Sequence, residues 1–561
     1  MNRNTEAHFS LAPHEKIRRS IFDRSHQVKT SFNNGKLIPI YLDEILPGDT
    51  FTLDLSAVIR NTSSFIKPIM DNLYLDTYFF FVPNRLVMDD WKKFMGENTD
   101  EWAQTAIVQI PQVQRPSGGW AAHTIADYFG IPTKITGTQS VNALPGRAYG
   151  LIWNEYFRDE NLQKSQIIYR DNTTRTGTNT ESDTDSACKY GPVLNVAKFH
   201  DYFTSCLPGP QKATNTETIP LTGILPVNIT ALTNNSNVKQ PLILSMTNGN
   251  NNTEMIEYKL KGFRDTNEYI YDSPYTGVVG TENDNSSIGY SNYPLVYKSG
   301  LTGTADTSYI GIDINQLRQH VAIQHIYETD ARCGTRYTEI IEGHFGVHSP
   351  DARLQRPEYL GGKRIPINID QVVQTSQTAT TPQGNVTAYS LTGDSSSMFT
   401  KSFTEHGYII GLCCVRAEHT YQQGLNRMWS RKERFDFFWP ELANIGEQAV
   451  LNQEIYQQGT SADTEGFGFQ EAWAEYRYKP SIITGQMRSN ATGSLDIYHL
   501  GDNYASKPVL GKDWIKEGTT NLDRTLAVTS STADQFIADF YFKLRCARPM
   551  PVYSIPGLKR I

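Results

Sequence analysis

Hydrophobic and polar residues alternate along several short stretches of the chain. In residues 51–60 the apolar side chains fall on one face, and near the end of the chain a second stretch does the same. These apolar positions are Phe51, Leu53, Leu55, Ala57 and Ile59, then Phe536, Ala538, Phe540, Phe542, Leu544 and Cys546. A period of two is typical of a strand with one face in the core. We therefore expect two half-buried strands, with Asp539, Lys543 and Arg545 on the polar face of the second.

Residues 73–82 show a different pattern, because apolar residues, including Phe79 to Phe81, occupy both faces. This favours a strand that is covered on both sides. The apolar run 408–415 is also of strand length, and its adjacent Cys413 and Cys414 should alternate, one towards the core and one away from it. Six cysteines in 561 residues, none in a CxxC arrangement, indicate reduced thiols.

Gly, Pro and Asn turns separate many such strands, and this organisation predicts a mainly β fold, an antiparallel sandwich instead of a βαβ arrangement. Helical spacing is limited to a few places. One is 145–163, and a second helix should begin near Asp313, with Gln316 at its third position and Leu317 and Val321 within it.

Residues 211–306 are crowded with Asn, Thr, Ser and Gly, with scattered tyrosines. This composition is typical of a surface insertion. A flexible loop is one interpretation. The apolar groups at 242–244 and 255–258 favour the other, a folded protrusion with short strands.

Hydrophobic residues make up 39% of the chain, enough for a sizeable core, and the net charge is −7. That charge argues against a surface that binds nucleic acid everywhere, so any such contact should be local. Both ends of the chain are locally basic, and residues 543–561 contain no acidic residue. The DNA-binding candidates are Lys16, Arg18, Arg19, Arg24 and Lys29, then Lys543, Arg545, Arg548, Lys559 and Arg560. Solvated tails are the alternative reading.

Enzymatic motifs are absent from the sequence. His344 and His348 have the spacing of a helical metal pair, but the residue after His344 is Phe345, and Gly346 opposes a helix, so we interpret both as loop histidines. No GxSxG or GxxxxGK pattern occurs. We predict no catalytic residue, metal or cofactor. The lack of a signal segment and of a long apolar run predicts a soluble protein without membrane insertion.

Arginine and aromatic residues interleave between 427 and 439. Such a mixture binds single-stranded DNA through phosphates and stacked bases, but it is also typical of subunit interfaces. We favour the interface for Arg427, Trp429, Arg431, Phe435 and Trp439.

The same region carries a resemblance to known proteins. From Glu405 to Gln458 its order of residues, including Tyr421, Gly424 and Pro440, resembles the major capsid protein of the microviruses, most closely the gokushovirus branch. Further matching residues are Leu46 to Thr50, Asn154 to Asp159, Phe469, Trp473, Tyr476 and Pro480, and the last strand running into Pro549 and Pro551.

This resemblance implies an eight-stranded jelly roll that forms a T=1 icosahedral shell around a circular single-stranded DNA genome. It implies a basic arm at 1–30, a capsid domain at 31–561, and an insertion at 211–306 that projects at the threefold axes for attachment to a host receptor. It also implies location in the virion, assembly in the bacterial cytoplasm, and minor virion proteins as further partners. The rival hypothesis is a carbohydrate-binding or carbohydrate-cleaving β-sandwich protein.

Overall fold

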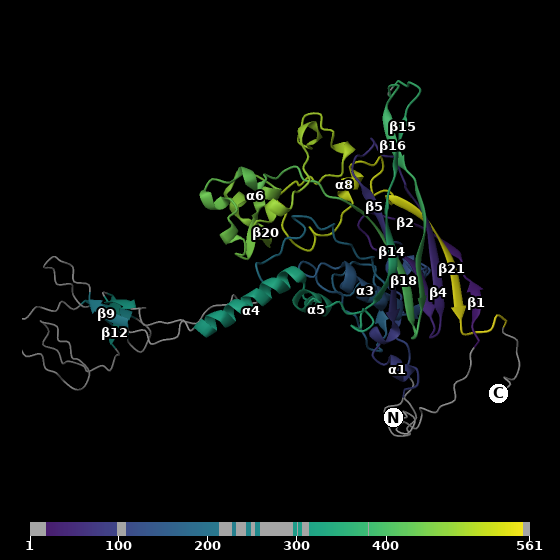
Figure 1. Ribbon diagram of the computed structural model, residues 1–561, viewed down its shortest axis with the longest axis horizontal. Helices are drawn as coiled ribbons and strands as arrows, with labels where there is room; N and C mark the ends of the chain where they lie inside the picture. Colours follow the sequence, from purple (N-terminus) through teal and green to yellow (C-terminus); the bar gives the residue numbers. More distant parts are fainter. Residues whose placement is uncertain are drawn as a thin grey trace, which may run out of the picture. The chain divides into compact units, whose positions relative to one another are not determined.

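The structure is a computed structural model, and it describes residues 18–97, 108–212, 314–379 and 381–553, with five further strands between 227 and 305. Its described part is mainly β, with few helices (Figure 1). Nearly all strand pairs are antiparallel, although β6 and β8 pair in parallel. The predicted class, mainly β with antiparallel sheets, is confirmed.

A five-stranded sheet forms one half of the main body, in the order β1-β21-β4-β17 with β2 also on β21. Its strands are β1 (Ser20–Asp23), β2 (His26–Phe32), β4 (Thr50–Asn61), β17 (Thr392–Ser402) and β21 (Phe536–Arg548). β1 and β2 pair with β21 in a single register, since Asp23 lies opposite Arg545 and His26 opposite Phe542. They therefore act as one strand with a break at residues 24 and 25.

A four-stranded sheet forms the other half, in the order β14-β5-β18-β3. Its strands are β3 (Ile38–Ile45), β5 (Leu73–Pro83), β14 (Glu358–Pro366) and β18 (Gly407–Ala417). Ion pairs join β14 to β17 at one edge of the two sheets, Lys363 with Asp394 at 2.7 Å and Lys401 with Glu358 at 2.6 Å.

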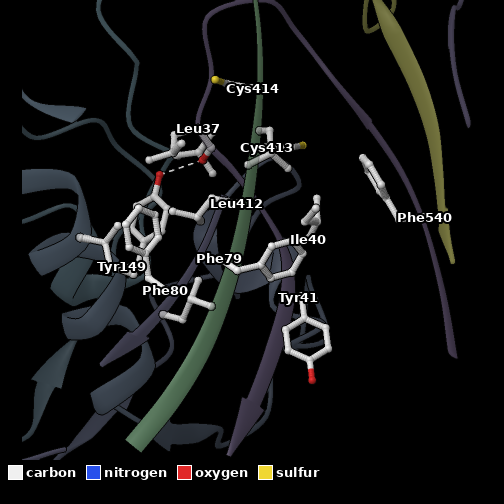
Figure 2. Close-up of a cluster of buried hydrophobic side chains, with 14 of the residues drawn as sticks. Leu37, Ile40, Tyr41, Phe79, Phe80, Tyr149, Leu412, Cys413, Cys414 and Phe540 are labelled. Carbon is white, nitrogen blue, oxygen red and sulfur yellow. Dashed lines mark hydrogen bonds between the residues drawn. The ribbon is translucent and has the colours of Figure 1, made fainter. Parts of the chain in front are cut away.

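The two sheets pack face to face around an aromatic core. The Phe542 ring from the five-stranded sheet lies 5.1 Å from Tyr41 and 6.5 Å from Phe79, which belong to the four-stranded sheet. In Figure 2, Phe79, Ile40 and Cys413 lie on the side of β18 that faces Phe540. The predicted half-buried strands are confirmed, because burial alternates along β4 and β21.

The four-stranded sheet is also covered on its outer side. Helix α3 (Leu144–Ile152) packs there, and Tyr149 donates a hydrogen bond of 2.9 Å to the Leu37 carbonyl (Figure 2). β5 and β18 are therefore buried on both faces, as predicted for β5. Cys413 and Cys414 alternate as predicted, with Cys413 on the side of β18 that faces Phe540 and Cys414 on the other side (Figure 2), and both are fully buried because the second face is covered as well. All six cysteines are free, as predicted.

The helices differ in length and position from those predicted. α3 continues as a π-helical turn to Phe157, after which Arg158 is extended, so the helix predicted to reach 163 is shorter than expected. The second predicted helix is α4 (Ile314–Cys333); Asp313 lies outside the described residues. The reading of His344 as a loop residue is wrong. It lies in α5 (Tyr337–Phe345), which ends at the left-handed Gly346.

The remaining small elements decorate this body. The β15–β16 hairpin extends beyond the end of the sandwich (Figure 1). The small helices and strands outside the two main sheets are α1 (Trp91–Phe94), β6 (Gln112–Gln114), α2 (Ile125–Tyr128), β7 (Ser140–Asn142), β8 (Arg175–Thr176), β15 (Ile369–Val373), β16 (Val386–Ser390), β19 (Glu447–Leu451), α6 (Asn452–Ile455), β20 (Gly466–Glu471), α7 (Ala474–Arg477) and α8 (Thr520–Asp523).

Residues 215–324 form a second compact unit. Its described strands are β9 (Val227–Ala231), β10 (Ile243–Thr247), β11 (Thr253–Glu257), β12 (Leu295–Ser299) and β13 (Leu301–Ala305). They form a sheet in the order β11-β10-β12 and a separate pair of β13 and β9. β10 and β11 contain four of the apolar residues that predicted short strands, Ile243, Leu244, Met255 and Ile256, while Leu242 and Tyr258 lie outside the described residues. The division into arm, capsid domain and insertion stays a prediction.

Candidate subunit interface and nucleic-acid contacts

An unusually apolar patch is exposed on the main body, and we call it the aromatic surface. Trp429 is 70% exposed and Phe435 66%. The other exposed members are Met428, Phe437, Phe438, Ile445, Tyr476, Tyr478 and Ile482. Among them, Phe438 and Tyr476 pack against each other, with ring centroids 6.3 Å apart, and exposed apolar groups that gather on a surface mark a site of interaction.

Short 3-10 turns present these rings. They cover Arg427–Trp429, Arg434–Asp436 and Pro440–Leu442. The Asn426 side chain caps the first by accepting from the Met428 amide at 3.0 Å. In the second, the amides of Glu433 and Lys432 donate to Asp436 and lower the pKa of that carboxyl. A rigid backbone therefore holds the rings in the absence of regular secondary structure.

Trp473 supports the rings of the aromatic surface directly. Trp473 is buried and adopts φ +66°, a left-handed conformation that is uncommon for a bulky residue. Its indole donates to the Leu442 carbonyl at 2.9 Å, and its ring packs edge-on to Phe438 at 5.8 Å. The matching residues around 473 thus form the base of the aromatic surface.

Arg427 and Arg431 of the aromatic surface form ion pairs within the chain, and Arg431 also contacts an aromatic ring. Arg431 pairs with Glu475 at 3.0 Å and lies over the Tyr476 ring at 4.3 Å. Arg427 reaches the same carboxylate at 4.0 Å and Glu454 at 3.5 Å. Two of the three interleaved arginines are therefore committed to carboxylates of the same chain, which favours the interface reading over phosphate binding.

The five predicted interface residues lie together in this one stretch. Trp429 and Phe435 project into solvent, while Arg427, Arg431 and Trp439 are half-buried. Arg434, which lies 4.5 Å over the Trp439 ring, was not among the five. Their role in assembly stays a prediction. Trp120, by contrast, is fully buried in the core of its own chain.

The DNA-binding candidates divide into three groups. Lys16, Lys559 and Arg560 lie outside the described residues, and Arg18 and Arg19 are exposed just before β1. Lys29, Lys543 and Arg545 are exposed on the outward face of the five-stranded sheet. Acidic residues share that face, since Asp54 lies 3.9 Å from Lys543 and Asp23 pairs with Arg545 across the strands.

The third group, Arg24 and Arg548, is bound within the fold. Arg24 pairs with Asp43 at 2.5 Å. Arg548 lies 3.3 Å from the fully buried Asp49, which follows Gly48 in the turn between β3 and β4. Gly48 has φ +92°, a conformation suited to glycine. Contact of these two arginines with DNA stays a prediction, but each already neutralises a buried carboxylate.

In the described part of the chain, no group of three or more His, Cys, Asp or Glu side chains could hold a metal ion. Among the described helices, none is long and apolar enough to cross a membrane.

Known proteins match the chain over nearly its full length. The model of the family described as "Capsid protein (F protein)" matches residues 10–558. Three relatives are named capsid protein VP1, from Chlamydia phage 1 (43% identical), Bdellovibrio phage phiMH2K (40%) and Spiroplasma virus 4 (41%). Each alignment covers at least 99% of this chain and 98% of the relative.

These matches confirm the resemblance to microvirus capsid proteins and give no support to a carbohydrate-binding or carbohydrate-cleaving protein. The relatives are structural proteins, in agreement with the prediction that the chain is not an enzyme. With a family model that matches almost every residue, the chain belongs to the capsid protein (F protein) family.

Proposed function

We propose that this chain is the major capsid protein of a microvirus and assembles into a closed T=1 icosahedral shell around a circular single-stranded DNA genome. Family membership supports a homo-oligomeric shell and a place in the virion. Minor virion proteins and assembly in the bacterial cytoplasm belong to the same proposal.

The proposed fold of the subunit is an eight-stranded jelly roll. When β1 and β2 are counted as one strand, each sheet has four strands. If the eight strands are numbered from one to eight in chain order, their order across the first sheet is 1-8-3-6. Across the second sheet it is 5-4-7-2. This alternation between two sheets of four supports a jelly roll, an architecture that viral capsids use.

The aromatic surface carries the assembly proposal, and its occupant would be a second copy of the chain. Trp429 and Phe435 project from a rigid support, so little conformational entropy would be lost when they are buried against a partner. Buried aromatic anchors dominate the binding energy of interfaces, each worth 2 kcal/mol or more on truncation. Obligate interfaces also bury on the order of 2,000–5,000 Å² of mainly apolar surface.

Replacing Trp429 and Phe435 together with serine tests this directly. Because both side chains are exposed, the variant should fold with unchanged thermal stability, yet the yield of shells in a sedimentation assay should fall at least tenfold. The control pair Trp429→Phe and Phe435→Tyr keeps the rings and should assemble. Wild-type shell yield from the serine variant would contradict the proposal.

We propose that residues 211–306 form the projection that binds a host receptor. The support is its separation as a compact unit, 215–324, and its polar and tyrosine-rich composition, which suits recognition. Replacing the segment with a short Gly and Ser linker should leave shells intact and abolish adsorption of particles to cells. A shortened chain that no longer folds would show instead that the segment belongs to the core.

The basic residues at the chain ends are the proposed genome contacts. Of these, Lys29, Lys543 and Arg545 have exposed side chains on one sheet face, and Arg18 and Arg19 precede it. Arg24, Arg548 and the residues outside the described part, Lys16, Lys559 and Arg560, complete the proposal.

A further inference from the structure

A cavity of about 720 Å³ lies on the outer side of the four-stranded sheet, opposite the face that carries Lys543 and Arg545. Its floor contains Tyr78 and Phe80 of β5. The segments 156–159 and 196–200 and the loop that follows α5 supply its walls. Its size is that of pockets that hold a small molecule or one unit of a polymer.

The lining of this cavity is strongly cationic in a chain that is acidic overall. Six Lys or Arg residues face two aspartates, Asp159 and Asp351. The six are Arg158, Lys198, Arg336, Arg356, Arg364 and Arg416. An excess of one sign within a concave site focuses the field and attracts an ion of the opposite sign.

The protein only partly neutralises these cations. Arg364 and Arg416 share a single carboxylate, Asp76, at 2.7 and 2.5 Å. Arg158 donates to the carbonyls of Glu160 and Gln163 and makes no ion pair with a described carboxylate. Burial and the neighbouring Arg336 lower the pKa of Arg158. A bound anion would relieve this repulsion.

Other cations in the lining are better matched. Arg356 lies 3.3 Å from Asp351, and Arg336 pairs with Glu339 at 2.7 Å. Lys198 lies 3.5 Å from Asp502. The uncompensated charge is therefore concentrated at Arg158 and at the Arg364–Arg416 pair.

Aromatic rings surround the same cations. Arg364 and Arg416 lie over the Phe199 ring at 4.4 and 4.2 Å. Tyr359, at the far end of the floor, packs against Phe80 at 5.5 Å and is 46% exposed. Its ring therefore offers a surface on which a planar group can stack.

We propose that this cavity binds a nucleotide unit of single-stranded DNA, with the phosphate at Arg364 and Arg158 and the base stacked on Tyr359. Guanidinium groups bind phosphate oxygens through paired N–H donors, and aromatic rings stack on any base. The choice of DNA as the occupant rests on the proposed function. An acidic peptide would satisfy the charges but would make no use of the exposed ring.

Binding of a fluorescent dT oligonucleotide of about ten units to the full chain tests the proposal. Tyr359→Ala should weaken binding roughly 5- to 140-fold, the range expected for loss of one stacked base. Arg364→Gln should weaken binding several-fold and reduce the salt slope by about 0.7.

The chain offers matched controls for both changes. Lys363→Gln removes the same charge from the adjacent position of β14, where the side chain pairs with Asp394 and does not line the cavity. Tyr389→Ala removes a tyrosine that is also 46% exposed, on β16. Both should bind within twofold of the unaltered chain.

Competitors identify the ligand. Thymidine 5′-monophosphate should displace the oligonucleotide at lower concentration than thymidine or inorganic phosphate. Equal displacement by inorganic phosphate would overturn base stacking, and equal displacement by oligoglutamate would assign the cavity to an acidic peptide. Unchanged affinity of Tyr359→Ala and Arg364→Gln would overturn the site itself.

Ultraviolet cross-linking provides a direct readout, since the cross-linked peptide should contain Tyr359. Sedimentation of the same variants keeps the two proposals apart. Shells should form normally from Tyr359→Ala and Arg364→Gln. If the unaltered chain itself forms no shells, the proposed function is contradicted, whereas the result of the binding assay still stands.

Discussion

The two sheets of the sandwich treat their outer faces in opposite ways. The five-stranded sheet exposes a hydroxyl-rich face, on which Ser56 and Ser395 lie 2.8 Å apart across neighbouring strands. The four-stranded sheet is covered by α3 and by connections that contain Tyr156 and Phe199. A single sandwich thus has one face in solvent and one beneath a second layer.

This difference determines where the substitution of a charged residue should lower the stability of the fold most. On the exposed face, ion pairs such as Lys543 with Asp54 are solvated and contribute little to stability. In the covering layer, charged groups are buried and depend on their partners. The cationic cavity and the cluster around His419 both lie in or beside that layer, so we expect substitutions there to have the larger effects.

The largest expected effect is at His419, whose ring lies between Asp502 and Glu517, each at 3.0 Å. Burial alone would lower its pKa, but the two carboxylates raise it to about 10. His419→Gln should reduce the free energy of unfolding by about 3–5 kcal/mol, because the carboxylates lose their buried cation. Urea unfolding at pH 6.5 measures this, with the exposed His348→Gln as control.

The pH dependence sharpens the same prediction. Since the folded pKa of His419 is above the unfolded value of about 6.5, its contribution to stability is complete below pH 6.5 and is lost as the pH rises towards 10. The unaltered chain should therefore lose more stability than His419→Gln between pH 6.5 and 10. Parallel pH profiles for the two proteins would contradict a charged His419.

A smaller effect is expected from deleting apolar groups on the two outer faces. Leu412 of β18 is fully buried on the α3 side (Figure 2), and Leu412→Ala should cost about 2–5 kcal/mol through the cavity it leaves. Val58 of β4 is exposed, so Val58→Ala should change the unfolding free energy by less than about 0.5 kcal/mol. Similar losses from both would show that the faces do not differ as described.

Much of this contrast could be predicted from the sequence. Strict alternation in 51–60 and 536–546 identified the solvent-facing sheet, and the doubly apolar run 73–82 identified the covered one. The alternation of Cys413 and Cys414 was predicted, but the burial of Cys414 was not, because residue polarity alone does not show that a helix covers the second face. The helix from 145 ended early because Asp159 accepts from the amides of Asn161 and Leu162, which forms a turn in place of another helical turn.

The sites were predictable only where their residues are close in sequence. The interleaved Arg and aromatic residues of 427–439 form one continuous stretch, so the aromatic surface could be anticipated. The cavity is assembled from distant segments, among them Arg158, Arg364 and Arg416, and no local pattern joins them. Its nearest signal was the matching stretch Asn154 to Asp159, whose Tyr156, Phe157 and Arg158 line the cavity.

The smallest expected effect concerns DNA on the exposed face. Lys543 and Arg545 point outward from β21, but Asp54, Asp23 and Asp539 share the face and offset their charge. Shells of Lys543→Gln with Arg545→Gln should assemble and release DNA at slightly lower salt, with the salt slope reduced by at most about 0.7 for each lost contact. Arg364→Gln with Tyr359→Ala should weaken retention more, because base stacking is lost along with charge. A larger loss from the β21 pair would make the exposed face the main genome contact, and unchanged retention at every salt concentration would remove Lys543 and Arg545 from that role.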